Sequence, residues 1–474
     1  MVTRRAVLGG LGAGAFAPTL WAAPGVASAR DLIAQADLSG DVSFVVADRR
    51  TGLVLEEYNA AKLMAAASTT KAITSLYALE HLGRDYRFST RIVATGPVQG
   101  GVVQGDLVLA GGADPTLDTD GLGVLAAKLG GAGIRGVTGR FMVWGGAIPY
   151  AAQIADDQPV HVGYNPAISG IVLNYNRVHF EWKRAGKGYE LSMDARGEKF
   201  RPRAYTAQAR LSNRKNPVYS YRDEGGKELW TVAAGALGKA GSRWLPVRHP
   251  EAYAGDVFQT LCRSHGIDLP APRPVSDFPG GQVVAAISSA DLPTILRDMM
   301  RFSTNLTAEA VGMMASAARG AGAGLGQSGR AMSDWIEARA GIGRAGFFDH
   351  SGLNVRSRIS AADMVQALRV VGAPMGVRGL MKPFDLRDNN GKKMKGGPLR
   401  IDAKTGTLDY VSTLAGYLTA PDGTELVFAI FTGDLARRKR MKESDSDKQA
   451  SSAWVRRSKI LQSRLLERWG ALYG

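Results

Sequence analysis

Residues 65–71 read AAASTTK, and the segment that follows carries apolar residues at helical spacing until Gly83. This pattern predicts that Ser68 lies at the start of a helix. Lys71 follows Ser68 by three residues, so on a helix both side chains project from one face. A serine hydroxyl is a poor nucleophile until a base removes its proton, and a lysine is such a base when burial or neighbouring positive charge lowers its pKa. The spacing therefore predicts a nucleophilic serine-lysine pair.

A second serine stands three residues before a lysine, at Ser212 and Lys215, so this spacing alone is a weak signal. That second match lies among Arg and Asn residues beside Pro217, and no helical pattern surrounds it. We therefore predict that Ser68, and not Ser212, is the nucleophile.

A second motif, Ser303-Thr304-Asn305, stands between two segments with helical periodicity, residues 292–300 and 306–318. A tight turn between two helices would let Ser303 and Asn305 project into a cleft. A third motif, Lys404-Thr405-Gly406-Thr407, opens a β-rich run, where glycine would let a substrate backbone approach and Lys404 and Thr405 would present donors to a carboxylate. Together and in this order, the three motifs predict one catalytic cleft.

The ordered set S-x-x-K, S-x-N and K-T-G resembles the signature of serine β-lactamases and penicillin-binding proteins. The long insertion between Lys71 and Ser303 is similar to that of the low-molecular-mass class C penicillin-binding proteins, the D-alanyl-D-alanine carboxypeptidase/endopeptidase family. Further phrases resemble that family along nearly the whole chain: residues 111–117 (GGADPTL), 164–166 (YNP), 173–176 (LNYN) and 349–353 (DHSGL).

The resemblance implies a periplasmic serine peptidase that acts on peptidoglycan stem peptides through an acyl-enzyme and is acylated by β-lactams, without a cofactor or metal. Matching the motifs position by position, the resemblance also implies a role for each residue of the site. Ser68 would be the acylated nucleophile and Lys71 its general base, while Ser303 and Asn305 would relay protons and hold the substrate amide. The substrate-binding residues would be Lys404, Thr405, Gly406 and Thr407, with the N–H groups of Ser68 and Thr407 as the oxyanion hole.

Two departures from the family pattern concern the cleft. Thr304 stands where the family usually has Asp, and residues 378–395 (RGLMKPFDLRDNNGKKMK) replace the usual G-T-L segment before the third motif. The second departure leaves the shape of the cleft rim, and hence substrate preference, open.

The fold that these patterns indicate is α/β (α+β), a β-lactamase/DD-peptidase-like domain whose antiparallel sheet is flanked by helices. Residues 41–48 and 53–58 read as a hairpin, residues 411–419 and 425–432 as another, and residues 450–472 as an amphipathic helix. One sheet would thus be built from both ends of the chain. The expected peptidase domain comprises residues 30–86 and 279–474, and a β-rich domain is inserted at 87–278, with a nested subdomain at about 183–245.

Residues 1–29 differ in character from the rest, because Arg4 and Arg5 are their only charges and Ala27-Ser28-Ala29 forms a small-residue cleavage pattern. We interpret them as an export signal. Residues 3–8 (TRRAVL) resemble a twin-arginine motif, and a general secretory route stays open. No later run is long and apolar enough to span a bilayer.

Composition narrows the functional classes further. A formal charge of +16 favours polyanionic surroundings, yet no nucleic-acid motif accompanies it, so we expect no nucleic-acid partner. Cys262 is the only cysteine and lies in a helical pattern that predicts a small buried residue. The six histidines show no metal-ligand spacing, His350 reads as a surface or packing residue and Glu309 as part of a helix.

Two other functions compete with the peptidase. A β-lactamase would differ in how fast its acyl-enzyme hydrolyses, and a non-catalytic peptidoglycan-binding protein would keep the inserted domain but leave the cleft idle.

Overall fold

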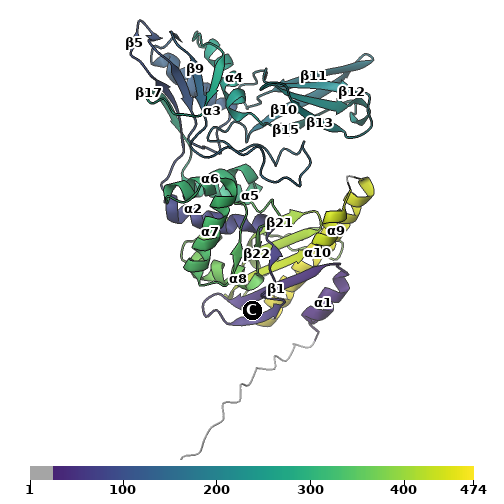
Figure 1. Ribbon diagram of the computed structural model, residues 1–474. Helices are drawn as coiled ribbons and strands as arrows, with labels where there is room; N and C mark the ends of the chain where they lie inside the picture. The colour runs from purple at the N-terminus through teal and green to yellow at the C-terminus, as the bar shows by residue number, and fades with distance from the viewer. Residues whose placement is uncertain (1–24, 443) are drawn as a thin grey trace, which may run out of the picture.

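The computed structural model describes residues 25–442 and 444–474 and consists of two lobes (Figure 1). Most of the predicted export signal, residues 1–24, lies outside this described part. Within the described ranges, no helix is long and apolar enough to cross a membrane.

The lower lobe of Figure 1 is built on a six-stranded sheet to which both ends of the chain contribute. In order across the sheet the strands are β2 (Val54–Tyr58), β1 (Asp41–Asp48), β23 (Glu425–Gly433), β22 (Val411–Thr419), β21 (Arg400–Leu408) and β20 (Lys382–Pro383). All neighbouring pairs are antiparallel. The two predicted hairpins and the sheet built from both termini are thus confirmed.

Side chains alternate between the two buried faces of this sheet. In β23, Val427, Ala429 and Phe431 join one apolar core, whereas Phe428 and Ile430 join the other. A strand with period-two alternation and both faces buried must be apolar throughout, which explains its nearly continuous hydrophobic sequence.

Helices cover both faces of the sheet. The first core is formed by α2 (Thr70–Leu82), α5 (Leu292–Phe302), α6 (Asn305–Ala318), α7 (Leu325–Ala340) and α8 (Ala361–Ala367). The second core is formed by α1 (Ala29–Ala36) and α10 (Asp445–Tyr473). Helix α10 is longer than the helix predicted over 450–472, and α9 (Leu435–Arg440) precedes α10 in the chain. Short elements complete the lobe: β3 (Met64–Ala65), β18 (Ala345–Gly346) and β19 (Arg358–Ile359), 3₁₀ turns at Ala67–Thr69 and Val377–Leu380, and a π turn at Leu368–Gly372.

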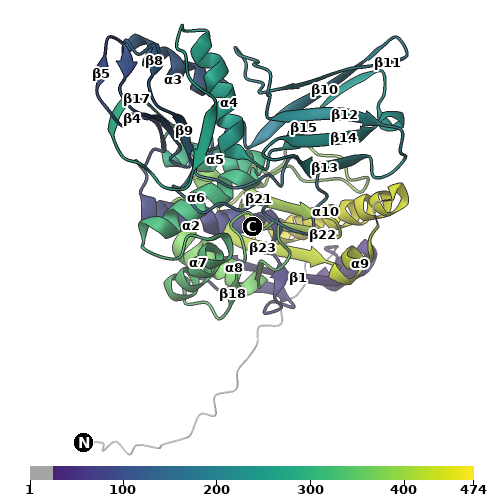
Figure 2. The same ribbon diagram turned by 45° about the horizontal axis from the view of Figure 1, so that its top comes forward.

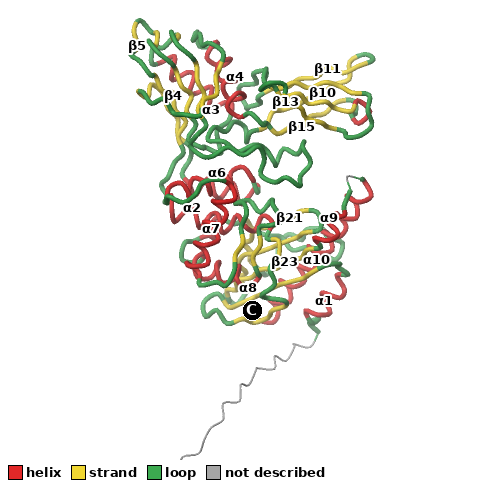
Figure 3. Tube along the Cα trace, in the orientation of Figure 1, coloured by secondary structure: helices red, strands yellow, loops and turns green. Residues whose placement is uncertain are grey.

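The upper lobe is mostly strand and loop (Figure 3) and contains two helices among its described residues, α3 (Thr119–Gly131) and α4 (Pro250–Arg263). These pack against a five-stranded sheet of β16 (Pro272–Val275), β9 (Phe141–Trp144), β7 (Leu107–Ala110), β4 (Ser89–Ala94) and β17 (Gln282–Ser288). A small sheet comprises β5 (Val98–Gln99), β6 (Val102–Val103) and β8 (Gly136–Val137). Buried Cys262 lies on α4, as predicted.

Two three-stranded sheets form the other part of this lobe, seen at the right of Figure 2. They contain β11 (Gly188–Asp194), β10 (Arg177–Ala185) and β15 (Ala240–Pro246), and β12 (Ala207–Ser212), β14 (Glu228–Ala233) and β13 (Tyr219–Asp223), with a 3₁₀ turn at Ala234–Ala236. The expected nested subdomain at about 183–245 overlaps these sheets, which begin earlier, at Arg177.

The end of the insertion differs from the boundary expected after Phe278. Strand β17 follows that boundary, yet it pairs antiparallel with β4 inside the five-stranded sheet. Residues 279–281 (PGG) instead connect β16 to β17 within the lobe, with Gly280 and Gly281 at φ +74° and +129°. The upper lobe therefore extends to Ser288.

Candidate active site

Ser68 lies in the 3₁₀ turn that leads directly into α2, which confirms its predicted place at a helix start. Ala67, just before it, has φ +44°, in the left-handed region that alanine rarely adopts. The chain is packed tightly here, because a Cβ on Gly352 would lie 1.8 Å from the carbonyl oxygen of Ala67. The turn is therefore held against the 349–353 segment, and Ser68 is partly exposed in a cavity of about 690 Å³.

Lys71 is fully buried and its Nζ has three oxygen neighbours. It lies 2.9 Å from Ser68 Oγ, 2.8 Å from Asn305 Oδ1 and 2.8 Å from the carbonyl oxygen of Ser351. The last two atoms can only accept hydrogen bonds. A neutral amine would therefore direct its two N–H groups to Asn305 and Ser351, and its lone pair to Ser68 Oγ.

Burial lowers the pKa of Lys71 from its ordinary value to about 8, because an ammonium group loses its hydration inside the protein. The carboxyl groups of Glu309 and Asp349 act in the opposite direction and raise that pKa. The balance leaves about a tenth of Lys71 neutral at pH 7 and half at pH 8, and the neutral amine is the form that a general base requires.

Asn305 begins α6, immediately after the turn that ends α5, and the inserted lobe also holds its side chain. Its Nδ2 donates to the carbonyl oxygen of Tyr164 at 3.0 Å, while its Oδ1 accepts from Lys71. The amide is thus oriented by both lobes.

Ser303 ends α5 with φ +59°, and its Oγ accepts from Lys404 Nζ at 2.9 Å. Lys404 Nζ also donates to the carbonyl oxygen of Thr405, and the side chain is only 1% exposed. Burial, followed by the charges of Lys71 and Lys382, lowers the pKa of Lys404 well below its usual range. The second and third motifs are therefore joined by a direct hydrogen bond.

Gly406 lies directly against the nucleophile. A Cβ at this position would be 2.2 Å from Thr413 Oγ1 and 2.8 Å from the backbone nitrogen of Ser68. The sequence suggested that this glycine makes room for a substrate backbone, but the space at its Cβ position is filled by the chain itself. Glycine is required here because β21 packs on the serine turn.

The two threonines of the third motif lie in different cavities. Thr407 lines the cavity that contains Ser68, Ser303 and Asn305. Thr405 instead lines a separate cavity of about 200 Å³, beside Lys459 and Gln462 of α10. Successive side chains of a strand point to opposite faces, so Thr405 and Thr407 share one face of β21 and Lys404 points to the other. The structure thus brings Ser68, Lys71, Ser303, Asn305, Lys404, Gly406 and Thr407 together, and Thr405 lines the adjoining cavity, which shares Arg387 and Lys459 with the Ser68 cavity.

Two buried carboxyl groups support the base, and the sequence analysis did not assign them to the site. Glu309 lies on α6, as expected, but its two oxygens each accept a backbone N–H, from His350 and Ser351, at 2.9 Å. Burial and the nearby Asp349 raise the pKa of Glu309. Glu309 follows Asn305 by four residues, so the helical spacing already indicated that they share a face.

Asp349 organises the 349–354 turn from within. Its oxygens accept from the N–H groups of Gly352 and Asn354 and from the hydroxyl of Ser357, and burial raises its pKa. This turn presents the carbonyl oxygen of Ser351 to Lys71. The segment that resembles the family's D-x-S-G-L therefore positions the base.

His350 packs in the core, which decides between the surface and packing positions that the sequence left open. Its Nε2 shares a hydrogen bond with Ser328 Oγ at 2.6 Å, and burial lowers its pKa to about 3. The imidazole is therefore neutral at ordinary pH. The rejected Ser212 lies at the end of strand β12 in the other lobe and not at the start of a helix, which agrees with its exclusion.

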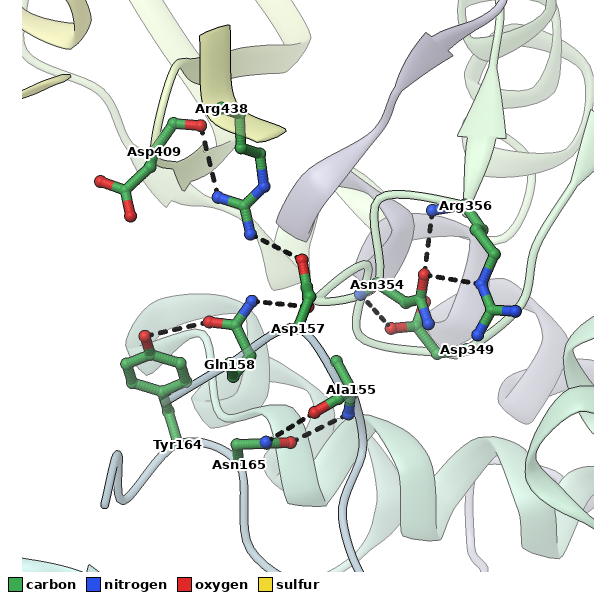
Figure 4. A network of polar contacts seen from close by, with 10 residues as sticks. All are labelled: Ala155, Asp157, Gln158, Tyr164, Asn165, Asp349, Asn354, Arg356, Asp409 and Arg438. Atoms are coloured by element: carbon green, nitrogen blue, oxygen red, sulfur yellow. Dashed lines mark hydrogen bonds and ion pairs between the residues drawn. The ribbon is translucent and has the colours of Figure 1, made fainter. Parts of the chain in front are cut away.

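A loop of the inserted lobe contacts α9 beside the cavity (Figure 4). Arg438 of α9 pairs with Asp157 at 2.9 Å and donates to the carbonyl oxygen of Asp409 at 3.4 Å. Gln158 Nε2 donates to Asp157, and the hydroxyl of Tyr164 donates to Gln158. Residues 157–164 therefore connect Arg438 of α9, which lines the cavity, to the side-chain amide of Asn305.

Comparisons with known proteins agree with this arrangement. The D-alanyl-D-alanine carboxypeptidase of Actinomadura sp. (strain R39) is 29% identical over 441 residues, which cover 83% of this chain and 78% of the relative. The D-alanyl-D-alanine carboxypeptidase DacB of Haemophilus influenzae is 24% identical over 429 residues, covering 85% and 89%.

The fold is also found among solved structures. The crystal structure of penicillin binding protein 4 from Haemophilus influenzae superposes with a TM-score of 0.74 at 20% identity, covering 93% of this chain and 99% of that one. The same protein has been solved in complex with a β-lactam, with a TM-score of 0.72 and 19% identity.

A model of the D-Ala-D-Ala carboxypeptidase 3 (S13) family matches residues 26–453, which is most of the chain. This match confirms the family resemblance drawn from the motifs. The chain is a serine-type D-Ala-D-Ala carboxypeptidase and belongs to the D-Ala-D-Ala carboxypeptidase 3 (S13) family.

Proposed function

We propose that this carboxypeptidase, exported to the periplasm by its N-terminal segment, cleaves peptidoglycan stem peptides through an acyl-enzyme on Ser68, both at terminal D-alanine and at cross-links, and that β-lactams acylate the same serine. The observation that carries the proposal is the surroundings of Lys71. With two of its neighbours restricted to accepting, the amine has only Ser68 Oγ as a proton donor.

In the proposed acylation step, neutral Lys71 takes the proton of Ser68 as Oγ bonds to the carbonyl carbon of the penultimate D-alanine. The backbone N–H groups of Ser68 and Thr407 would stabilise the oxyanion, each donor contributing about 3 kcal/mol. The C–N bond then breaks, and the departing amine needs a proton. The hydroxyl of Ser303, hydrogen-bonded to Lys404, would deliver it and would then be reprotonated by the proton that Lys71 took from Ser68, so that Lys71 is neutral again in the acyl-enzyme.

Deacylation repeats the step with water in place of the serine. Neutral Lys71 takes a proton from water as the water oxygen bonds to the ester carbonyl carbon, the bond to Ser68 Oγ then breaks, and Lys71 passes that proton to Oγ. The substrate's terminal carboxylate would be held by Thr407, which lines the cavity, and the proposed role of Lys404 is to fix Ser303. The complex of a relative with a β-lactam supports acylation by such drugs.

The test compares Ser68→Ala with Ser212→Ala. Ser68→Ala is expected to abolish both covalent labelling by a fluorescent penicillin and release of D-alanine from a peptide ending in D-Ala-D-Ala. Because one partly exposed hydroxyl contributes little to stability, Tm should change by no more than a few degrees. Ser212→Ala should label like the wild type. Labelling that survives in Ser68→Ala would refute the assignment.

Two further measurements address the finer parts of the proposal. Digestion of purified cross-linked muropeptides, followed by mass analysis, should yield both shortened stems and separated monomers. If only shortened stems appear, the endopeptidase part of the proposal is refuted. A penicilloyl-enzyme that persists for many minutes would exclude a β-lactamase, whereas rapid recovery of free enzyme would favour one.

A further inference from the structure

Two sheets of the inserted lobe each end in an outer strand, and these two strands are close in the chain. Strand β11 is the outer strand of the sheet β11-β10-β15, and β12 is the outer strand of the sheet β12-β14-β13 (Figure 2). Val178 and Phe180 of the first sheet and Trp230 of the second belong to one apolar core. The two outer edges are therefore parts of one packed unit.

The chain turns between β11 and β12, and the two strands then separate. An antiparallel bridge joins Asp194 to Arg203, but no ladder joins β11 to β12 in the described part of the chain. The N–H groups of Tyr205 and Thr206 donate instead to Asp256 Oδ2 on α4, at 2.6 and 3.1 Å. Helix α4 thus holds the chain just after the turn, and the two edges stay unpaired with each other.

Backbone groups of both edges point away from their own sheets. The carbonyl oxygen of Met193 accepts from the N–H of Ala204, so it faces outward from β10. Because strand backbone groups alternate in direction, the N–H and C=O of Leu191 face the same way. The carbonyl oxygen of Thr206 accepts from β14, so the N–H and C=O of Ala209 face away from β14. Such edges can pair with a further strand.

A cavity of about 470 Å³ lies between the two edges. Its lining consists of residues 191–194 of β11, residues 207–210 of β12 and two arginines of the turn between them. The side chains of Leu191 and Ala209 in this lining are partly buried and pack against the apolar core. The cavity therefore combines free backbone groups with an apolar surface, the two features that strand addition uses.

The charged side chains of this cavity are mostly basic. Arg201, Arg203 and Arg210 are exposed, and the guanidinium of none of them bonds to a carboxylate among the described residues. The carboxylate of Asp194 accepts from both Nε and Nη2 of Arg196, at 3.0 and 2.9 Å. The cavity thus has an excess of positive charge, which favours a ligand with carboxylate side chains.

We infer that the cavity between β11 and β12 binds an extended acidic segment of another protein, which adds a strand to the free edges. In such a strand, side chains would face the apolar core and the arginines alternately. An anionic polymer without a peptide backbone would use the arginines alone. The inference does not depend on the reaction proposed at Ser68.

The probe for this site is a fluorescein-labelled peptide of eight residues in which Glu and Val alternate. Fluorescence anisotropy with the purified protein is expected to show saturable binding, at least tenfold tighter than that of a peptide with Lys in place of Glu. Because the whole chain is positively charged, this preference alone does not locate the site.

Backbone methylation tests the strand addition itself. Two further peptides carry N-methyl groups, on every Glu in one and on every Val in the other, and therefore lose the N–H donors of opposite edges of the added strand. At least one of the two should bind at least tenfold more weakly than the parent peptide.

Variants of the protein locate the site. Arg203→Gln and Arg210→Gln should each weaken binding of the Glu-Val peptide by about threefold to tenfold. Lys187→Gln, in the turn between β10 and β11 and outside the cavity lining, removes the same charge and should bind like the wild type. Thermal melts and unchanged labelling by a fluorescent penicillin would show that all three variants are folded.

Several results would overturn the inference. Absence of saturable binding of the Glu-Val peptide up to about 1 mM would do so. If both N-methylated peptides bind like the parent and inorganic polyphosphate displaces it, the arginines attract polyanions of any kind and no strand is added. An equal loss of binding in Lys187→Gln would show that the peptide does not bind in this cavity. Loss of penicillin labelling in the wild type would instead refute the proposed function and leave this inference intact.

Discussion

Lys71 must lose its proton before it can accept one from Ser68, so its pKa governs the pH range of acylation. Burial lowers this pKa to about 8, and the protonated form predominates below that value. We expect kcat/KM for acylation to rise about tenfold per pH unit below pH 8 and to level off above it. Stopped-flow acylation by a penicillin between pH 6 and 10 measures this profile. A flat profile from pH 6 to 9 would contradict the role of Lys71 as base.

Glu309 offers a test of how that pKa is set. Its charge raises the pKa of Lys71, so Glu309→Gln should move the midpoint of the acylation profile to lower pH. Because the new amide group would face a backbone N–H of His350 or Ser351, the variant should also lose about 1–3 kcal/mol of stability.

A matched control variant separates the shift of the acylation midpoint from the loss of stability. Glu337 on α7 likewise accepts a backbone N–H, from Ala345, but it does not act on Lys71. The amide oxygen of Gln can still accept this single N–H, so Glu337→Gln should leave the midpoint in place and change Tm little. If both variants keep the wild-type profile, the role of Glu309 is structural only.

A substitution at Gly406 tests how closely β21 approaches the nucleophile Ser68. In Gly406→Ala the added methyl group would collide with Thr413 and with the backbone nitrogen of Ser68, so the strand or the serine turn must shift. A misplacement of about 1 Å costs on the order of 100-fold in rate. Acylation by penicillin should fall by that factor. Gly397→Ala, where a Cβ meets nothing within 4 Å, should retain the wild-type rate.

At the level of elements, the packing of α6 against the 349–353 segment decides the geometry of the base. A Cβ on Gly312 of α6 would lie 2.2 Å from Cγ of His350, so the helix backbone touches the imidazole ring. The same helix carries Asn305 and Glu309, which contact Lys71 and the turn. One helix therefore fixes both acceptors of Lys71, the amide directly and the carbonyl of Ser351 through Glu309.

The burial of His350 in this packing makes the stability of the lower lobe depend on pH. The pKa of His350 is about 3 in the folded state and 6.5 in the unfolded state, so the unfolded chain binds a proton first as pH falls. The stability that depends on neutral His350 is present above pH 6.5 and is lost at about 1.4 kcal/mol per pH unit below it. Urea unfolding of the wild type and His350→Gln between pH 4 and 7 should show a shallower dependence in the variant. Exposed His265→Gln should retain the wild-type slope, and equal slopes in all three proteins would contradict this account.

At the scale of the whole molecule, the inserted lobe takes part in the site because its 154–165 loop connects to Asn305. Asn165 holds that loop from inside: its Oδ1 accepts from the N–H groups of Ile154 and Ala155, and its Nδ2 donates to the carbonyl oxygen of Ala155. Arg248 adds a bond to the carbonyl oxygen of Asn165. The lobe is therefore more than a separate binding module.

Asn165→Ala should loosen this connection. It leaves two buried N–H groups without their acceptor, at a cost of about 1–3 kcal/mol each, and frees the backbone that carries Tyr164. We expect faster proteolysis within residues 154–165 and slower acylation of Ser68. Unchanged acylation in a loop that is cleaved faster would show that the inserted lobe does not orient Asn305.

Much of the fold was predictable because it depends on short-range periodicity. The start of α2 at the serine, the two hairpins and the long C-terminal helix follow from apolar spacing and turn residues. The two-residue period of a strand also predicts that Lys404 and Thr405 point in opposite directions. The sequence analysis nevertheless assigned both side chains to one substrate carboxylate. The insertion boundary was missed because a Pro-Gly-Gly turn within a lobe has the same composition as a linker between lobes.

The sequence by itself therefore determined which residue types carry the chemistry, their order along the chain and the local elements that hold them. Only the tertiary structure decided what surrounds the base, since the partners of Lys71 lie 234 and 280 positions away in the chain. It also decided the burial that lowers the pKa of Lys71. Periodicity acts over a few residues, whereas burial and charge depend on which distant segments pack together.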